Sequence, residues 1–244
     1  MASKTAPRLF SEGPIERGGE KSLSPEQTHY LAHVLRLSPK DKVLIFNGVD
    51  GEWIAELKQG KGAFKVMPIE QTRPQTVAQD LIYAFAPLKH ARMDYVVQKA
   101  VEMGASVLQP VLTARTVVNK VNVERAGANA IEAAEQCGIL SVPAVLPPKK
   151  LKAILQEWGG SRLLIFCDES AEVSSPLSIL HALSRGTPAA VLIGPEGGFT
   201  DEERHLIASK PFAHAISLGP RIMRADTAGV AALALYNAVL GDWR

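Results

Sequence analysis

The sequence predicts an α/β protein with a small β-rich part followed by a larger part built on a mostly parallel sheet. Its 244 residues are long for one domain and comfortable for two. Before about Met67, apolar runs are joined by Asn-Gly and Asp-Gly pairs, which favour hairpins. From Asp80 onward, short apolar runs alternate with segments of helical periodicity, a pattern typical of a parallel sheet covered by helices on both faces.

A hairpin and a short helix are predicted in the first part. Residues 42–46 and 52–57 are the two strands, because the glycines between them tolerate the positive φ of a tight turn. For the helix, Ser24 is the predicted N-cap, Pro25 the first helical residue and Gln27 the partner in a capping box. The helix should bury an apolar stripe made of Tyr30, Leu31, Val34 and Leu35. The polar, proline-containing segment 70–76 is the predicted linker.

Strands and helices alternate in the second part. The predicted strands are 81–86, 107–112, 163–167, 189–193 and 215–218. One helix covers about 93–104, and a second runs from Val123 to Cys137 and ends at Gly138. A third begins at Thr200, which forms a capping box with Glu203. The uncharged segment 227–241 is too short to span a membrane and fits a buried core helix.

Composition excludes several classes of protein. The two cysteines, Cys137 and Cys167, have no metal-ligand spacing, so we expect a reducing compartment and neither disulfides nor a metal site. His29 and His33 lie four residues apart without a third ligand nearby, which favours ordinary surface or packing roles. The first residues hold no signal peptide and no segment reaches membrane-spanning length, so we expect a soluble, cytoplasmic protein. A net charge of +2 neither supports nor excludes a nucleic-acid partner.

Two predicted strands run into loops that both begin with Gly-Pro. The first loop, 194–200, carries Glu196, and the second, 219–227, carries Arg221, Arg224 and Asp226. Ligands bind beyond the carboxyl ends of strands in open α/β sheets, although a tight turn without a ligand also fits each loop taken alone. Neither loop has the glycine spacing of a P-loop or a dinucleotide fingerprint, which disfavours a nucleotide hydrolase.

These two motifs, Ile193–Gly198 and Leu218–Ala228, resemble the paired C-terminal motifs of the RsmE family. Its members are 16S ribosomal RNA uridine-N3 methyltransferases of the SPOUT superfamily. The similarity extends to Lys89, to residues 92–94, 98–100, 102–104 and 132–136, and in the first part to 29–31, 34–36, Asp41 and 46–48. Two positions depart from the family pattern: His90 replaces a usual glycine, and Asp226 replaces a usual glutamate.

The resemblance implies a fold and an assembly. Residues 76–244 would form a SPOUT-type, trefoil-knotted parallel-sheet domain, and residues 1–72 a small β-rich, PUA-like RNA-binding domain. The family works as a homodimer with its site at the subunit interface. The uncharged helix after Thr227 fits such an interface as well as it fits a core.

The resemblance also implies S-adenosylmethionine as the cofactor, held in a bent form by the knotted loops. The implied cofactor residues are Cys167, Gly194, Glu196, Gly197, Gly198, Leu218, Gly219, Ile222, Met223 and Thr227. Arg224 would stabilise a uridine anion or a phosphate, and Arg221 would contact substrate unless it is a plain surface charge. Asp226 would accept the N3 proton or orient Arg224, although a helix N-cap is an equal alternative.

Phosphate contacts are expected from Arg8, Arg36, Lys89 and Arg92, each of which also fits a solvated surface charge. The implied partner is 16S ribosomal RNA in the small ribosomal subunit, methylated at N3 of a uridine. Two alternatives stay open at this point. One is a SPOUT methyltransferase for another RNA nucleotide, and the other is a non-catalytic RNA-binding assembly factor.

Overall fold

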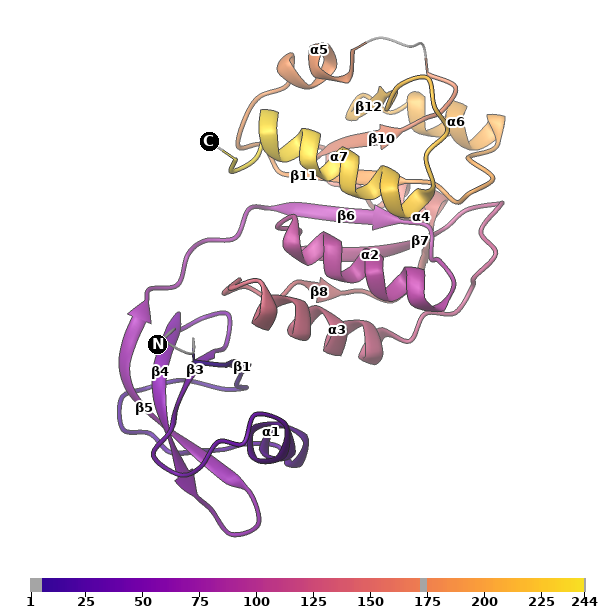
Figure 1. Cartoon of the computed structure of the whole chain (residues 1–244). Coiled ribbons are helices and arrows are strands. Elements are labelled where there is room, and N and C mark those ends of the chain that lie inside the picture. The colour runs from indigo at the N-terminus through magenta and orange to yellow at the C-terminus, as the bar shows by residue number, and fades with distance from the viewer. Residues whose placement is uncertain (1–5, 172–174, 244) are drawn as a thin grey trace. The chain divides into compact units, whose positions relative to one another are not determined.

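The computed structural model describes residues 6–171 and 175–243, which divide into two compact units (Figure 1). The first unit holds the described residues up to Val77 together with Ala134–Val142. The second holds Ala78–Ala133 and the described residues from Pro143 onward.

The first unit is a five-stranded sheet with one helical segment. Its elements are β1 (Arg8–Phe10), β2 (Lys21–Ser22), α1 (Pro25–His29), the π-helix η1 (Tyr30–Val34), β3 (Lys42–Phe46), β4 (Glu52–Gln59) and β5 (Phe64–Arg73). The strand order is β1-β3-β4-β5-β2, with β1 parallel to β3 and the other pairs antiparallel. Phe46 pairs with Glu52 at the closed end of β3 and β4, which confirms the predicted hairpin.

The predicted start of the first helix is confirmed in detail. The Ser24 hydroxyl accepts a hydrogen bond from the Gln27 amide at 3.1 Å, and the Gln27 side chain accepts one from the Ser24 amide at 3.1 Å. Two backbone donors that a helix start leaves without partners are thereby satisfied. The Gln27 side-chain amide also donates to the carbonyl of Phe10 at 2.8 Å, so the capped helix is tied to β1.

The predicted apolar stripe of this helix is wrong in half of its members. Leu31 is fully buried in the core of the unit and Leu35 packs against that core, but Tyr30 is 40% exposed and Val34 is 59% exposed. The reason is the π-helical turn, in which the Leu35 amide donates to the carbonyl of Tyr30 at 3.0 Å. The wider turn breaks the regular helical spacing on which the predicted stripe depended.

The predicted linker is also shorter than expected, because β5 continues to Arg73. Arg73 pairs with Glu52 in the β4–β5 ladder, and its guanidinium donates to both carboxylate oxygens of Glu52, at 3.0 and 2.7 Å. A register shift between Ile54 and Ala55 lets β5 accommodate Pro68, which has no amide to donate.

The second unit is a parallel sheet with helices on both faces. Its elements are β6 (Leu81–Phe85), α2 (His90–Glu102), β7 (Val107–Leu112), α3 (Val123–Gln136), β8 (Ala144–Val145), β9 (Lys149–Lys150), α4 (Leu151–Gln156), β10 (Leu163–Cys167), α5 (Pro176–His181), β11 (Ala189–Ile193), α6 (Asp201–Ala208), β12 (Ala213–Ile216) and α7 (Ala225–Val239). The last residues of α3 fall in the first unit. The strand order is β12-β10-β11-β6-β7-β8, with β9 also paired to β7.

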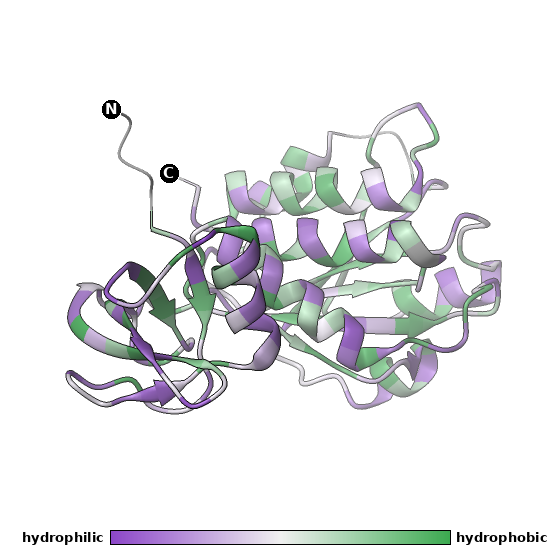
Figure 2. Cartoon of the chain, turned by 60° about the horizontal axis from the view of Figure 1, so that its bottom comes forward, coloured by the Kyte–Doolittle hydropathy of each residue, from purple (hydrophilic) through white to green (hydrophobic). Residues whose placement is uncertain are grey.

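The alternation of side chains along the strands builds two apolar layers. Ala84, Leu164 and Leu192 belong to a buried cluster with Leu155 of α4 and Ile207 of α6. The other face is covered by α2 and α7, which contact each other and lie in front of the sheet in Figure 1. In Figure 2 the strands of this sheet are mostly green, whereas the helices mix green and purple, as expected for amphipathic helices that cover a buried sheet.

Most helix and strand limits of the second part agree with expectation. Gly138 follows α3 with a φ of 69°, and Thr200 and Glu203 form the predicted capping box of α6. The last strand was placed two residues too late, because the β12 ladder with β10 ends where Ile216 pairs with Cys167.

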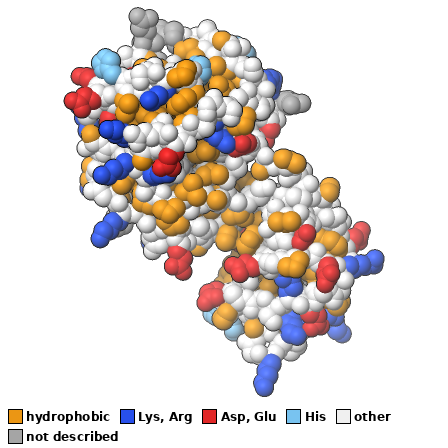
Figure 3. Space-filling model, turned by 180° about the vertical axis from the view of Figure 1, so that it is seen from behind, with side chains coloured by type: hydrophobic (Ala, Val, Ile, Leu, Met, Phe, Trp, Pro, Cys, Tyr) orange, Lys and Arg blue, Asp and Glu red, His pale blue; other side chains and the backbone are white. Residues whose placement is uncertain are grey.

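Among the described residues, no helix is long and apolar enough to cross a membrane. Figure 3 shows positive and negative side chains interspersed on both units, in keeping with the small net charge. Recognition of a charged partner therefore depends on where individual side chains lie.

Candidate active site

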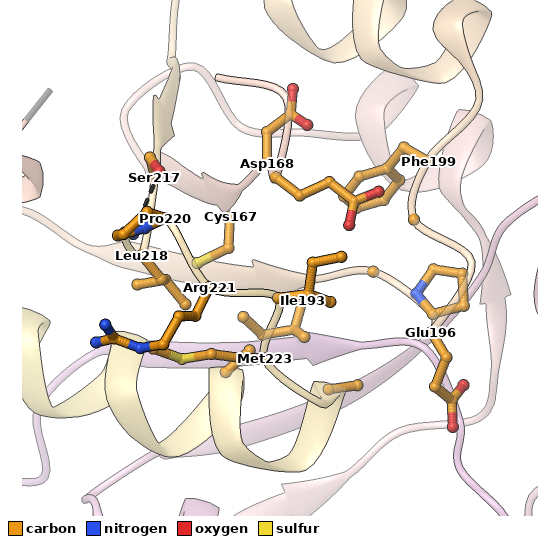
Figure 4. A pocket seen from close by; sticks show the side chains of 18 residues that line it. Cys167, Asp168, Ile193, Glu196, Phe199, Ser217, Leu218, Pro220, Arg221 and Met223 are labelled. Atoms are coloured by element: carbon orange, nitrogen blue, oxygen red, sulfur yellow. Dashed lines mark hydrogen bonds between the residues drawn. The ribbon is translucent and has the colours of Figure 1, made fainter. Parts of the chain in front are cut away.

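A cavity of about 220 Å³ lies beyond the carboxyl ends of β10, β11 and β12. Three loops enclose it, one after each strand, together with the start of α7 (Figure 4). Its lining consists of Cys167, Asp168, Glu169, Ile193, Gly194, Pro195, Glu196, Gly198, Phe199, Ser217, Leu218, Gly219, Pro220, Arg221, Ile222, Met223, Ala225 and Ala228. The two Gly-Pro loops thus share one cavity, as their position after neighbouring strands implied.

Most of the predicted site residues meet at this cavity. Those that line it are Cys167, Gly194, Glu196, Gly198, Leu218, Gly219, Arg221, Ile222 and Met223. Gly197 and Thr227, which were predicted to bind the cofactor, are not among the lining residues. Gly197 turns its carbonyl outward to Arg115, and Thr227 is an exposed residue in the first turn of α7.

The wall formed by 194–200 owes its shape to a tight turn at Gly198. The Gly198 amide donates to the carbonyl of Pro195 at 2.8 Å, and its φ is +67°. A Cβ at this position would lie 2.5 Å from a carboxylate oxygen of Glu169. Only glycine fits here, because the backbone is left-handed and a neighbouring loop approaches closely.

Arg115 braces the same wall from outside the cavity. It follows β7, and its guanidinium donates to the carbonyls of Gly197 at 2.6 Å and Phe199 at 3.4 Å. Glu203 adds a second link, because its carboxylate accepts from the amides of Ala114 at 2.7 Å and Thr200 at 3.1 Å. Sequence reasoning missed Arg115, since no local pattern marks a contact to a loop about eighty residues away.

Asp168 and Glu169 also line the cavity; they lie in the loop after the strand that ends at Cys167, which the resemblance implied as a third wall without naming these two residues. Arg204 of α6 holds them, donating to Asp168 at 3.1 Å and lying 3.7 Å from the Glu169 carboxylate. Both directly follow β10, so the strand-end argument applied to the Gly-Pro loops would have found them. Both add negative charge to the cavity lining, and Asp168 lies opposite Met223 in Figure 4.

The loop after β12 presents free backbone groups to the cavity. Within the described chain, the amides and carbonyls of Leu218, Ile222 and Met223 form no hydrogen bonds. All three residues line the cavity. Their backbone donors and acceptors are therefore available to a ligand.

The floor of the cavity is apolar and uncharged near Cys167. Burial raises the pKa of the Cys167 thiol to about 12, so the thiol remains protonated at neutral pH. Burial also raises the pKa of Tyr83 on β6, and the nearby Cys167 and Asp226 add to that shift.

The structure places the three predicted catalytic residues at the entrance to α7 and corrects one interpretation. The N-cap of α7 is Arg224, and Asp226 lies inside the first turn, so the N-cap alternative for Asp226 is wrong. In the described part of the chain, the guanidinium groups of Arg221 and Arg224 have no hydrogen-bond or ion-pair partner. Asp226 therefore does not orient Arg224 through a salt bridge here.

Arg8 does not fit its predicted role as a phosphate contact. Its side chain is only 12% exposed and donates to Glu52 at 2.6 Å, to the carbonyls of Ala134 at 2.6 Å and Glu135 at 2.8 Å, and to that of Ile139 at 3.1 Å. Four of the five guanidinium donors are thus used inside the first unit, and the group holds this part of the chain together.

The other three predicted phosphate contacts differ in their environment. Arg92 forms an ion pair of 2.8 Å with Glu196, whose carboxylate points away from Cys167 in Figure 4. Arg36 and Lys89 are exposed and, among the residues described, have no side-chain partner. Arg36 and Lys89 are therefore the candidates whose charge is free.

Comparison with known proteins gives the family. A model described as an RNA methyltransferase domain matches residues 75–237, and one described as an RNA methyltransferase PUA domain matches residues 23–67. A ribosomal RNA small subunit methyltransferase E from Rickettsia conorii is 33% identical over 213 residues, which cover 86% of either chain. The chain belongs to the RsmE family. An RsmE protein from Bacillus subtilis is 28% identical over 91% of both chains.

Solved structures related to RsmE agree with this assignment. An RsmE protein from Neisseria gonorrhoeae, bound to S-adenosyl methionine, has a TM-score of 0.83 and 25% identity, covering 98% of this chain and all of the other. A putative methyltransferase from Legionella pneumophila, also with bound cofactor, has a TM-score of 0.81 and 28% identity over 96% of this chain and 97% of the other. The predicted fold class, a SPOUT-type α/β domain with a small PUA-like β-rich domain, is confirmed.

Proposed function

We propose that this RsmE-family chain transfers a methyl group from S-adenosylmethionine to N3 of a uridine in 16S ribosomal RNA of the small ribosomal subunit. One observation carries the proposal. Backbone groups that have no partner among the described residues line one cavity at three adjacent strand ends, together with Arg221, and Arg224 lies in the chain between the lining residues Met223 and Ala225. The RNA methyltransferase models and the RsmE relatives support the choice of reaction and substrate. We keep 1–72 and 76–244 as the limits of the RNA-binding and catalytic domains.

The cavity fits S-adenosylmethionine on its own chemistry. The side chains of Leu218 and Met223 offer apolar surface for a planar base, and their free backbone groups match the hydrogen-bonding edge of adenine. Asp168 and Glu169 place negative charge where a cationic ligand needs a partner. When bound there, S-adenosylmethionine supplies the methyl group carried on its sulfonium.

Methylation of uridine N3 requires removal of a weakly acidic ring proton. We assign Asp226 to accept that proton, directly or through a water molecule, because it is the carboxylate of the first turn of α7, beside lining residues Ala225 and Ala228. Proton transfer to a positioned base is worth about 10²- to 10⁴-fold in rate. Arg224 stabilises the charge that develops on the uracil ring as the proton leaves.

Arg221 and Arg224 also suit recognition of RNA. Both are exposed, and in the described chain neither has an acidic partner that RNA would have to displace. N3 lies on the pairing edge of uracil, so the target base must be unpaired or turned out of a helix. Lys89, exposed at the start of α2, is a further phosphate contact in this proposal.

We further propose that the protein is a cytoplasmic homodimer. Along α7, Val230, Ala231, Ala234 and Leu235 are only half-buried, although they are apolar. A second copy packed on this uncharged surface would bury it. The cytoplasm is where a ribosomal RNA substrate is found.

The test is methyl transfer from labelled S-adenosylmethionine to intact small subunits and to naked 16S RNA. We expect labelled RNA with the wild type, and a large loss with Arg224→Ala while cofactor binding persists. Lys152→Ala, at an exposed lysine on α4 away from the cavity, serves as the control. Stoichiometric cofactor binding without transfer to either RNA would instead indicate a non-catalytic RNA-binding factor.

A further inference from the structure

The first unit has an exposed aromatic face on its helical segment. His29, Tyr30 and His33 are exposed, although Leu31 between them is fully buried. The rings of His29 and His33 are 4.8 Å apart between centroids, with an interplanar angle of 41°. Val34 lies four residues after Tyr30 and is 59% exposed. The Tyr30 ring is therefore exposed at a position that the predicted stripe would have buried, and it lies next to two exposed histidines in the chain.

The π-helical turn is what exposes this face. It spans Tyr30–Val34 and replaces the normal spacing, so Tyr30 and Val34 leave the core while Leu31 stays in it. Turns of this kind are rare and often found at functional sites. The capping box at Ser24 and Gln27 fixes the start of the helix, so the exposure of Tyr30 is built into an anchored segment.

Two basic residues with unusual backbone follow the aromatic face. Arg36 has a φ of 56° and Lys40 a φ of 80°, and in the described chain no other residue except glycine has a positive φ. L-amino acids rarely adopt this conformation, and such positions cluster at functional sites. Both side chains are exposed, and within the described residues neither forms a hydrogen bond or an ion pair, although the charge of Lys40 adds to the lowering of the Glu56 pKa that Lys58 mainly causes. Among the described residues, the neighbouring Asp41 forms no ion pair with either of them, and its carboxylate instead accepts a hydrogen bond from the Ser38 amide at 2.7 Å.

We propose that this surface, made of His29, Tyr30, His33, Arg36 and Lys40, binds an unpaired stretch of RNA. A base would stack on Tyr30 and the neighbouring histidine rings, and Arg36 and Lys40 would contact the flanking phosphates. Aromatic rings beside free cations are the combination that single-stranded nucleic acid uses, because every base has a flat face and every linkage a negative charge. The inference rests on the proposed RNA substrate and adds where and how the first unit holds it.

The test compares full-length variants for binding to a labelled single-stranded RNA of mixed sequence and to the same strand annealed to its complement. We expect the wild type to prefer the single strand. Tyr30→Ala should weaken single-strand binding by about 5- to 150-fold, the range for loss of one base–aromatic stack. Tyr30→Phe keeps the ring and should bind like the wild type, whereas Tyr30→Leu keeps only apolar bulk and should bind weakly.

The basic residues are tested by the salt dependence of the same binding. Arg36→Ala should lower the slope of log affinity against log salt by about 0.7, as expected for one phosphate contact on a single strand. Arg17→Ala, at an exposed arginine of the same unit outside the surface, should leave the slope unchanged. Two results would overturn the inference. In the first, Tyr30→Ala binds the single strand as tightly as the wild type does. In the second, the wild type binds the duplex as tightly as the single strand.

Cofactor binding and methyl transfer, measured on the same variants, separate this inference from the proposed function. If RNA binding depends on Tyr30 but the protein transfers no methyl group, only the proposed reaction is contradicted. If the protein transfers methyl groups to RNA but binds that RNA equally well without the Tyr30 ring, only the stacking surface is contradicted.

Discussion

Replacement of Gly229 by alanine tests how closely α7 packs against the sheet. Gly229 is buried in the middle of α7, and a Cβ there would lie 2.1 Å from the hydroxyl oxygen of Tyr83 and 3.0 Å from Cζ of its ring. Tyr83 cannot move aside easily, because it is 1% exposed and stacked on Phe85 with ring centroids 5.0 Å apart. The substitution therefore forces the helix or the strand to shift.

Two effects of opposite sign compete in this variant. Alanine is favoured over glycine in a helix by about 1 kcal/mol. Overpacking of a close-packed interior costs about 1–3 kcal/mol, and contact at 2.1 Å places Gly229→Ala at the upper end of that range. We therefore expect a net loss of about 1–2 kcal/mol in the free energy of unfolding. For a chain of this length that loss lowers the Tm by roughly 2–8 °C.

Thermal unfolding followed by circular dichroism measures this effect, and two variants sharpen it. Gly127→Ala is the matched control, because Gly127 lies inside α3 with nothing within 4 Å of the added Cβ, and it should stabilise the protein. Tyr83→Phe removes the hydroxyl, so Gly229→Ala should cost less in that background, with a coupling of about 1 kcal/mol. Stabilisation by Gly229→Ala equal to that by Gly127→Ala would refute the close approach of α7 and β6.

Three further predictions concern the site and the first unit. Arg115→Ala should raise the Kd for S-adenosylmethionine about 5-fold without changing RNA binding, because the loop at Gly197 loses the hydrogen bond that Arg115 donates to it. An unchanged Kd, measured by calorimetry, would show that Arg115 does not support the site. Asp226→Asn should reduce methyl transfer by at least about 100-fold while cofactor binding persists, and Asp226→Glu should retain activity; full transfer by the asparagine variant would end the proton-acceptor role. Burial alone would raise the pKa of Glu52, but hydrogen bonds from arginines including Arg8 outweigh it and lower that pKa. The ionised Glu52 should therefore stabilise the fold at pH values above about 4.3, the pKa of a glutamate in the unfolded chain. This contribution is lost as the pH falls through the lower pKa that Glu52 has in the folded protein. The variant Glu52→Gln should abolish this pH dependence in acid unfolding curves.

Features set by near neighbours in the chain were predicted well. The capping boxes at Ser24 and Thr200 depend on residues three positions apart, and both are present. The parallel sheet and its helices followed from periodicity, because a buried strand and an amphipathic helix each leave a regular apolar pattern. The position of the two Gly-Pro loops at adjacent strand ends likewise brought most predicted site residues into one cavity.

Features set by distant contacts were missed. Arg8 donates to three carbonyls about 130 residues further along the chain, and nothing in its sequence neighbourhood indicated these contacts. The continuation of β5 to Arg73 depends on pairing with Glu52, and the brace at Arg115 depends on the loop after β11. The π-helical turn at Tyr30–Val34 was also missed, because no residue pattern in the sequence marks the wider turn.

The most direct test of the central claim is to locate the methyl group in the product. Small subunits or 16S RNA from cells lacking an RsmE activity would be incubated with the protein and S-adenosylmethionine, digested to nucleosides and analysed by mass spectrometry. The proposed chemistry at Arg224 and Asp226 predicts one new 3-methyluridine per 16S RNA, absent with Asp226→Asn. A methyl group on a different base or on a ribose, with N3 of uridine unmodified, would contradict it.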